Sequence, residues 1–274
     1  MTTAPSARDR SGVVARLRAA GCVFAEDEAR LLVAATDTPA ELAAMVERRV
    51  AGVPLEHLLG WAEFLGLRIA VDPGVFVPRR RTEFLAAQAT ALTPPHAVVL
   101  DLCCGSGAVG AALAAAVPGI ELHAVDIDAA AVRCARRNLA AAGGHVYRGD
   151  LYEPLPDALR GGVDVLVANA PYVPTESIGL MPPEARLHEP RAALDGGRDG
   201  LDVLRRVAAA APDWLAPAGH LLVETSARQA PSTVQAVAAA GLRPRVVAAP
   251  ERGATVVIAT VIATATTTVT SPAG

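Results

Sequence analysis

The sequence predicts an α/β fold of the Rossmann-like type, with helices packed on a largely parallel sheet. From residue 81 onwards, short apolar runs of strand length alternate with longer runs whose apolar residues have helical spacing. A glycine-rich turn separates the first of these strands from its helix. Four successive predicted strands also end at a polar residue, and in open α/β sheets ligands bind at that carboxyl edge.

The first two of these strands predict a nucleotide site. The apolar run 97–100 ends at Asp101 and is followed by Leu102-Cys103-Cys104-Gly105-Ser106-Gly107. The missing side chains of this turn allow a ligand to lie against the backbone and the N-terminus of the next helix. The run 121–125 ends at Asp126, about twenty residues beyond the glycines, where a carboxylate accepts hydrogen bonds from ribose hydroxyls.

The next two strands add polar groups at the same edge. The run 145–148 leads into Gly149-Asp150-Leu151, and the run 165–168 leads directly into Asn169-Ala170-Pro171-Tyr172. A planar amide carries two N–H donors, and the Asn169 side-chain oxygen and the Ala170 carbonyl can accept both. Pro171 restricts Ala170 to an extended conformation, and Tyr172 can pack on the flat face of the held group. By themselves these four residues equally fit a strand that ends in a proline turn.

Asp101 discriminates between two nucleotide ligands. The spacing of Gly105, Gly107 and Gly110 also satisfies the dinucleotide fingerprint of NAD-dependent oxidoreductases. A carboxylate at the mouth of this turn would repel a pyrophosphate by roughly 1 kcal/mol at a separation of about 4 Å in water, and by more when partly buried. It suits a ligand that carries an ammonium group and no phosphate, and S-adenosylmethionine is such a ligand.

Taken together, these motifs resemble the bacterial protein-(glutamine-N5) methyltransferases, the HemK-type enzymes that methylate the Gly-Gly-Gln glutamine of peptide chain release factors. The resemblance extends from about Arg48 to about Thr260. Besides the cofactor loop it includes the segments 48–67, 71–83 and 189–200. The tetrapeptide is Asn-Pro-Pro-Tyr in the family, and Ala170 in place of the first proline keeps the carbonyl acceptor.

The resemblance implies a class I S-adenosylmethionine-dependent methyltransferase with a small N-terminal helical domain. It divides the chain into a substrate-docking domain, a hairpin linker, the methyltransferase domain and a disordered tail, at residues 1–51, 52–80, 81–262 and 263–274. It assigns cofactor binding to Asp101, Cys103, Cys104, Gly105, Ser106, Gly107, Asp126, Asp150, Leu151 and Asn169. It assigns the methyl-acceptor site to Asn169, Ala170, Pro171 and Tyr172, without a metal.

The expected reaction is methylation of the side-chain amide nitrogen of a glutamine in a release factor or another translation protein, such as a ribosomal protein. The helical region before Arg48 looks shorter than the family's docking domain, so a paralogue with its own target stays open. Two further functions also stay open. One is a translation-associated module that binds the cofactor without turnover, and the other is a nucleic-acid adenine N6-methyltransferase.

Composition and length favour a cytoplasmic monomer with one large and one small domain. The chain has 274 residues, of which 52% are hydrophobic, enough for a large buried core. Its net charge of -3 offers no electrostatic attraction to nucleic acid or to an anionic membrane. The N-terminus lacks the apolar core of a signal peptide, and no run approaches the roughly 20 apolar residues of a membrane helix. The four cysteines have no metal-ligand spacing.

The remaining charged residues are expected to be structural or solvated. The basic run 79–81 predicts a solvated face, and His57 and His96 predict surface or capping residues. His188 and Glu189 belong to a loop, 182–198, that can form a substrate wall. Residues beyond about Val261 are rich in Thr and Ala with little to bury, and they predict an edge strand that frays into the disordered tail.

Overall fold

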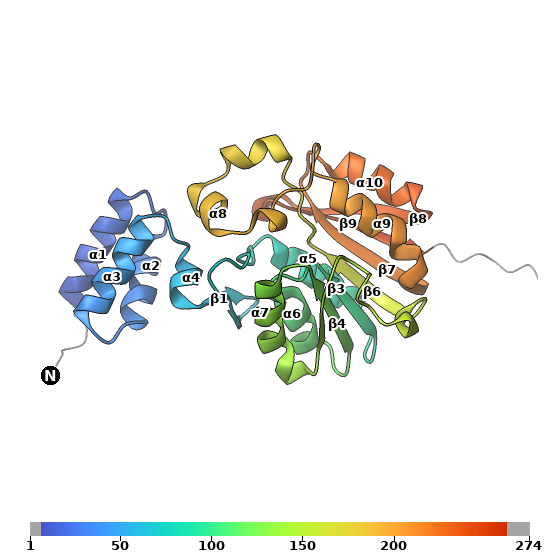
Figure 1. Cartoon of the computed structure of the whole chain (residues 1–274), viewed down its shortest axis with the longest axis horizontal. Helices are drawn as coiled ribbons and strands as arrows, with labels where there is room; N and C mark the ends of the chain where they lie inside the picture. The colour runs from blue at the N-terminus through green and yellow to red at the C-terminus, as the bar shows by residue number, and fades with distance from the viewer. Residues whose placement is uncertain (1–6, 262–274) are drawn as a thin grey trace, which may run out of the picture.

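The computed structural model describes residues 7–261, and its centre is a seven-stranded sheet (Figure 1). The strands are β3 (Val98–Leu102), β4 (Glu121–Asp126), β5 (His145–Arg148), β6 (Val163–Ala168), β7 (Leu215–Thr225), β8 (Leu242–Ala249) and β9 (Ala254–Val261). They lie in the order β5-β4-β3-β6-β7-β9-β8, and every neighbouring pair from β5 to β7 is parallel. This arrangement confirms the predicted Rossmann-like α/β fold.

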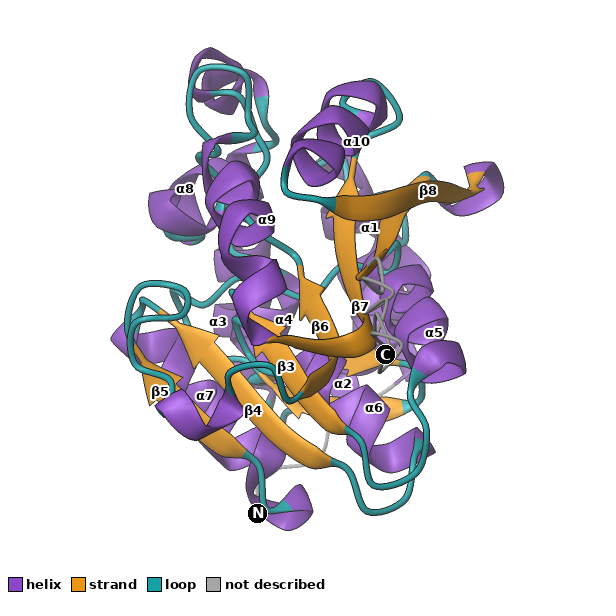
Figure 2. Cartoon of the chain, turned by 90° about the vertical axis from the view of Figure 1, so that its right-hand side faces the viewer, coloured by secondary structure: helices purple, strands orange, loops and turns teal. Residues whose placement is uncertain are grey.

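Helices cover both faces of the sheet (Figure 2). One face packs against α5 (Thr82–Leu92), α6 (Ala108–Ala116) and α7 (Ala129–Leu139), and the other packs against α9 (Asp202–Trp214) and α10 (Ala230–Ala239). Successive strand residues point to opposite faces, so Val99 joins one apolar cluster and Leu100 the other. Because both clusters are buried, the central strands are predominantly apolar on both faces rather than regularly alternating with polar residues.

The N-terminal helices form a separate apolar cluster. These are α1 (Ala7–Ala19), α2 (Ala25–Ala34) and α3 (Pro39–Val50), which pack around buried residues that include Leu17, Leu32 and Val46. Thr38 begins α3 with a capping box, in which its hydroxyl accepts from the Glu41 N–H and Glu41 accepts from the Thr38 N–H. The short helix α4 (Leu55–Leu59) and the hairpin of β1 (Trp61–Phe64) and β2 (Leu67–Ala70) then lead to the sheet. Among residues 7–261, no helix combines the length and the apolar character needed to cross a membrane.

One sequence expectation about local structure was wrong. The segment 182–198 contains a short helix, α8 (Pro183–His188), and a 3-10 turn, η4 (Arg191–Ala193), rather than only loop. The edge strand and disordered tail expected beyond about Val261 lie outside the described residues. The last described strand, β9, lies inside the sheet, because it pairs antiparallel with both β7 and β8. β8 forms the edge and exposes Arg243 and Val246 there.

One arginine of α3 joins the N-terminal helices to α8. Arg49 is 7% exposed, and its Nε donates to Glu28 Oε2 of α2 at 2.6 Å. Its Nη1 also donates to Glu184 of α8, and burial of the guanidinium is offset by these two carboxylates, which raise the pKa of Arg49. Figure 1 shows α8 between the N-terminal helices and the helices that pack on the sheet, so this contact joins the N-terminal helices to the segment that carries α8.

Replacing Arg49 by methionine should therefore destabilise the fold. The Arg49→Met change leaves Glu28 buried without its counter-charge, and we expect the free energy of unfolding in urea to fall by about 3 kcal/mol. Arg30→Met is the matched control, because Arg30 and its partner Asp27 are both exposed and 3.8 Å apart. Its effect should stay below about 0.5 kcal/mol. Equal unfolding midpoints for Arg49→Met and the unmodified chain would contradict the assignment.

Candidate functional site

A cavity of about 360 Å³ lies at the carboxyl ends of β3, β4 and β6. Twelve of the thirteen residues predicted for the site line it: Asp101, Cys103, Cys104, Gly105, Ser106, Asp126, Asp150, Leu151, Asn169, Ala170, Pro171 and Tyr172. Gly107 does not line it. A Cβ at Gly107 would lie 3.2 Å from the backbone of Ala135, and its φ is +78°, so this glycine lets α6 begin close against α7.

The turn after β3 is held by hydrogen bonds to β4. The Cys104 N–H donates to the Val125 carbonyl at 3.0 Å, and the Gly105 N–H donates to Asp126 Oδ2 at 2.8 Å. Cys103 has a φ of 55°, a left-handed conformation that is uncommon for a residue with a side chain. Cys103 and Cys104 both line the cavity, and Cys104 is the more deeply buried of the two. In the described part of the chain all four cysteines are free, and no cluster of metal-ligand residues occurs.

Asp101 is a buried carboxylate whose negative charge is only partly balanced by hydrogen bonding within the protein. It is 2% exposed, and its Oδ2 accepts from the Gly110 N–H at 3.0 Å. Burial raises the pKa of Asp101 to about 7, against the lowering effect of the Gly110 hydrogen bond, and the charge of Asp126 adds to the rise. A buried carboxylate of this kind is stabilised by a ligand that brings a positive charge, such as an ammonium group.

Asp126 is fixed in orientation at the end of β4. In addition to the Gly105 contact, its Oδ1 accepts from the Asp128 N–H at 2.8 Å. Burial raises the pKa of Asp126, while the backbone hydrogen bonds lower it. The neighbouring Ile127 is 56% exposed and lines the cavity, which gives it an apolar wall that the sequence analysis missed.

Asp150 is paired with an arginine from a distant helix. Arg206 of α9 donates from Nη2 to Asp150 Oδ2 at 2.7 Å, and both residues line the cavity. No local sequence signal identified Arg206, because α9 lies more than fifty residues away from Asp150. The residues of this half of the cavity fit S-adenosylmethionine. Asp101 offers a buried carboxylate for the ammonium group and Asp126 an oriented carboxylate for the ribose, while Ile127 and Leu151 offer apolar surfaces for the base.

Asn169 and Ala170 present free acceptors at the other end of the cavity. The Asn169 Nδ2 donates to the Thr82 hydroxyl at 3.4 Å, and the amide oxygen Oδ1 does not take part in this contact. Among residues 7–261, neither Asn169 Oδ1 nor the Ala170 carbonyl has a hydrogen-bond partner within the protein. Both acceptors that the sequence predicted are therefore available to an incoming amide or amine.

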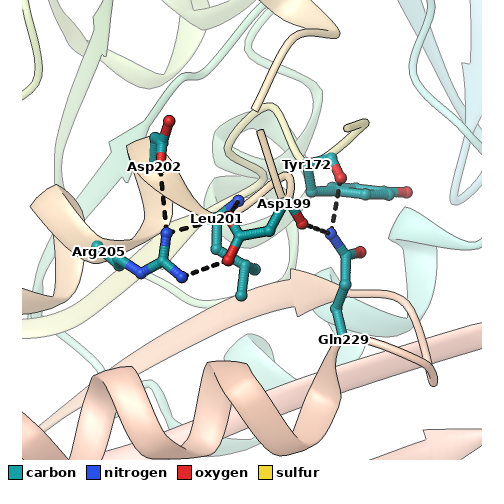
Figure 3. A network of polar contacts seen from close by, with 6 residues as sticks. All are labelled: Tyr172, Asp199, Leu201, Asp202, Arg205 and Gln229. Carbon is teal, nitrogen blue, oxygen red and sulfur yellow. Dashed lines mark hydrogen bonds and ion pairs between the residues drawn. The ribbon is translucent and has the colours of Figure 1, made fainter. Parts of the chain in front are cut away.

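Tyr172 is held both by its ring and by its backbone. Its hydroxyl donates to Glu224 Oε1 at 3.1 Å. Its carbonyl accepts from Gln229 Nε2 at 2.9 Å, and the same nitrogen donates to the Asp199 carbonyl (Figure 3). Gly200 lies so close that a Cβ there would be 2.3 Å from the Tyr172 carbonyl oxygen. The loop at 195–202 therefore packs directly on the backbone of the tetrapeptide.

The basic run 79–81 is not simply a solvated face, as the sequence suggested. Arg80 and Arg81 are exposed and Arg79 is half-buried, but Arg79 and Arg81 line the cavity. Arg79 pairs with the buried Glu189 at 2.5 Å, and Arg81 pairs with the buried Glu224 at 3.1 Å. The two glutamates come from segments more than a hundred residues away, so the run itself contained no sign of them.

Two other expectations about charged residues have different outcomes. His57 is buried rather than on the surface, with its Nε2 2.8 Å from the Val75 carbonyl. Glu189 has the structural role expected of its loop, because Oε1 accepts from the Val77 N–H at 3.2 Å and Oε2 pairs with Arg79. His57 and Glu189 thus both anchor the linker segment that precedes α5.

Comparisons with known proteins agree with this geometry. Residues 66–197 match the model of the family described as "Methyltransferase small domain". A release factor glutamine methyltransferase from Geobacter sulfurreducens is 43% identical over 197 residues, which cover 70% of this chain and 68% of that protein. A 4-amino-L-phenylalanine/4-methylamino-L-phenylalanine methyltransferase from Streptomyces pristinaespiralis is 38% identical over 67% of this chain and 65% of that protein. A methyltransferase structure from Pyrococcus furiosus, 16% identical, shares the fold with a TM-score of 0.54 over 80% of this chain and 96% of its own.

The pKa of Asp101 predicts how cofactor binding depends on pH. A bound ammonium group requires the ionised carboxylate, so binding should weaken as the pH falls below about 7 and should level off above it. Between pH 8 and pH 6 the affinity for S-adenosylhomocysteine should fall about tenfold by calorimetry. Asp101→Asn should bind more weakly at both pH values and should lose this dependence. An unmodified protein with equal affinity at pH 6 and pH 8 would exclude the assignment.

Removing the Asp126 carboxylate should weaken cofactor binding at any pH. Asp126→Ala loses a hydrogen-bond acceptor for two hydroxyls, and we expect about 1–3 kcal/mol less binding free energy by calorimetry. Asp157→Ala is a suitable control, because the Asp157 side chain is 90% exposed and remote from the cavity. The ribose assignment fails if both variants bind S-adenosylhomocysteine as the unmodified protein does.

Proposed function

This chain belongs to the family of release factor glutamine methyltransferases, and from that premise we propose that it methylates the side-chain amide nitrogen of a glutamine in a peptide chain release factor. The cofactor is S-adenosylmethionine, which supplies an electrophilic methyl group when bound. The observation that carries the proposal is the pair of free acceptors, Asn169 Oδ1 and the Ala170 carbonyl, in two residues that line the cofactor cavity.

The residues of the cofactor half bind and orient without taking part in bond making. Asp101 attracts the ammonium group, and Asp126 receives the ribose hydroxyls in the orientation fixed by Gly105 and Asp128. Ile127 and Leu151 exclude water from the faces of the base. Together these contacts fix the position of the reactive group relative to the acceptor residues.

The residues of the acceptor half address the weakness of an amide as a nucleophile. The nitrogen lone pair of an amide is delocalised into its carbonyl, so its open face must be held in line with the methyl group. Asn169 and Ala170 accept the two N–H bonds in one plane, and each contact stabilises the developing positive charge by about 2–4 kcal/mol, or about thirty- to a thousandfold in rate. Tyr172 packs on the flat face, which restricts the amide to that plane.

The site needs no strong base beside the nitrogen. A methylated amide that carries an extra proton is acidic enough to lose it to water. Tyr172 does not supply a base, because burial, together with the charge of Glu224, raises the pKa of its hydroxyl to about 12. The Tyr172 hydroxyl is also already donating its proton to Glu224.

A free amino acid is a second candidate acceptor. The Streptomyces pristinaespiralis relative, whose name describes an enzyme that acts on 4-amino-L-phenylalanine, is nearly as similar in sequence as the Geobacter sulfurreducens relative. A planar aromatic amine also carries two N–H donors that Asn169 and Ala170 can hold. The release factor remains the first candidate, because several relatives that are 40–43% identical carry that name.

We further infer the setting in which the reaction occurs. The helices of residues 1–51 would dock the protein substrate, residues 52–80 would link them to the methyltransferase domain at 81–262, and the enzyme would act as a cytoplasmic monomer. The net charge of -3 supports an acceptor other than nucleic acid. The Arg49 contact to α8 supports a docking role, because α8 lies in the chain between Met181 and Pro190, which both line the cavity.

Asn169→Ala should abolish methylation while the cofactor still binds. The change removes one of the two acceptors for the amide, and transfer of labelled methyl groups to purified release factor should fall at least about a hundredfold. Calorimetry should show S-adenosylhomocysteine binding within about threefold of the unmodified protein, since Asn169 lies at the acceptor end. Gln235→Ala, which removes an exposed amide of α10, should behave as the unmodified protein.

The same assay separates the candidate acceptors. Label should enter the release factor and should disappear when its Gly-Gly-Gln glutamine is changed to asparagine. Label in free 4-amino-L-phenylalanine and none in the release factor would replace the first candidate with the second. A near-normal rate for Asn169→Ala would refute the role of Asn169 in holding the amide.

A further inference from the structure

Glu224 is a buried carboxylate next to the acceptor site that has no role in the reaction described above. It lies near the end of β7, is 2% exposed and does not line the cavity itself. Among the described residues, its Oε2 is the buried side-chain oxygen or nitrogen that lacks a hydrogen-bond partner. A buried carboxylate with one unsatisfied oxygen is costly to the fold, which points to a function for the group.

The contacts of Glu224 all lead to the acceptor site. Its Oε1 accepts from the Tyr172 hydroxyl at 3.1 Å and from Arg81 Nε at 3.1 Å. The Arg81 guanidinium also lies over the Tyr172 ring, 5.8 Å from its centroid. One carboxylate oxygen therefore joins the ring that packs on the acceptor to a cation at the start of α5.

The backbone and the ring of Tyr172 are held by different partners. Gln229 holds the carbonyl (Figure 3), and Gly200 packs so closely on it that even a Cβ would not fit there. Neither contact restrains the side chain. Glu224 holds the ring at its far end, and Arg81 compensates the charge that Glu224 brings into the protein.

We propose that Glu224 is a positioning residue for methyl transfer, which acts by fixing the Tyr172 ring against the acceptor amide. Arg81 is its counter-ion, with Nε 3.1 Å from Oε1 of the buried Glu224. This inference rests on the proposed function of the same site, because a fixed ring matters only where a flat group must be held in line. It adds the end of β7 and the start of α5 to the elements that set the reaction geometry.

The kinetic test compares substitutions at both ends of the contact. Glu224→Met removes the acceptor, and kcat for release factor should fall about a hundredfold while S-adenosylhomocysteine affinity stays within about twofold. Glu224→Gln keeps an oxygen that can accept from Tyr172 and should recover most of that loss. Tyr172→Phe should reduce kcat as Glu224→Met does, and the double variant should be no slower than either single variant. Glu251→Gln, at an exposed glutamate between β8 and β9 that does not line the cavity, is the matched control.

A second measurement does not depend on the acceptor. The chain has three tyrosines, so selective ¹³C labelling of their Cζ atoms gives three assignable signals. The Tyr172 signal should move in Glu224→Met, whereas the Tyr152 signal should not, because the Tyr152 hydroxyl donates to the Val207 carbonyl at 2.8 Å. Melting temperatures identify any variant that fails to fold, and Tyr172→Phe and Glu224→Gln then provide the comparison.

The outcomes separate this inference from the proposed function. If the unmodified protein labels no release factor, the proposed function is overturned. The tyrosine signals then still test whether Glu224 holds the Tyr172 ring. Glu224→Met with unchanged kcat, or with an unchanged Tyr172 signal, overturns the positioning role. Multiplicative losses in the double variant overturn it as well, because Glu224 and Tyr172 would then act independently.

Discussion

The site depends on the parallel pairing of β3 with its two neighbours. In the registers of these pairs, Leu102 lies opposite Val125 of β4 and opposite Ala168 of β6. The next residues along β4 and β6, Asp126 and Asn169, therefore flank the turn that follows β3. A shift of either register would separate Asp126 or Asn169 from that turn. The apolar packing on both faces of the sheet fixes these registers, so the same packing that stabilises the core also sets the geometry of the site.

Buried charge pairs then connect the outer segments to this edge. Glu28, Glu189 and Glu224 are each less than a tenth exposed, and each is paired with an arginine from the segment 49–81. A buried carboxylate without its counter-charge would be strongly destabilising, so the segment that carries the arginines cannot move away from the glutamates. As a result, the N-terminal helices, the linker and the start of α5 are electrostatically joined to the site.

The acceptor tetrapeptide illustrates how packing can replace local rigidity. Ala170 takes the place of a proline, and so lacks the ring that would fix its own φ. Ala170 is 4% exposed, however, and the loop at 195–202 packs on the backbone that follows it. A Cβ at Gly196 would lie 2.6 Å from the Pro171 carbonyl oxygen, which shows how little space the loop leaves. The Ala170 carbonyl is therefore kept in place by its neighbours in space.

The sequence by itself determined the sheet, the order of its first four strands along the chain and twelve residues of the cavity, because these depend on local patterns. Apolar runs, a glycine turn and polar strand ends are all visible within a few residues, and parallel strands bring their carboxyl ends together. Only the tertiary structure revealed Arg81, Glu189, Arg206 and Glu224 at or beside the site, and the inner position of β9. Their partners are distant in the chain, and the sign of a charge does not show which opposite charge it will meet. Long-range pairing of buried charges depends on how the elements pack, and local sequence carries no record of it.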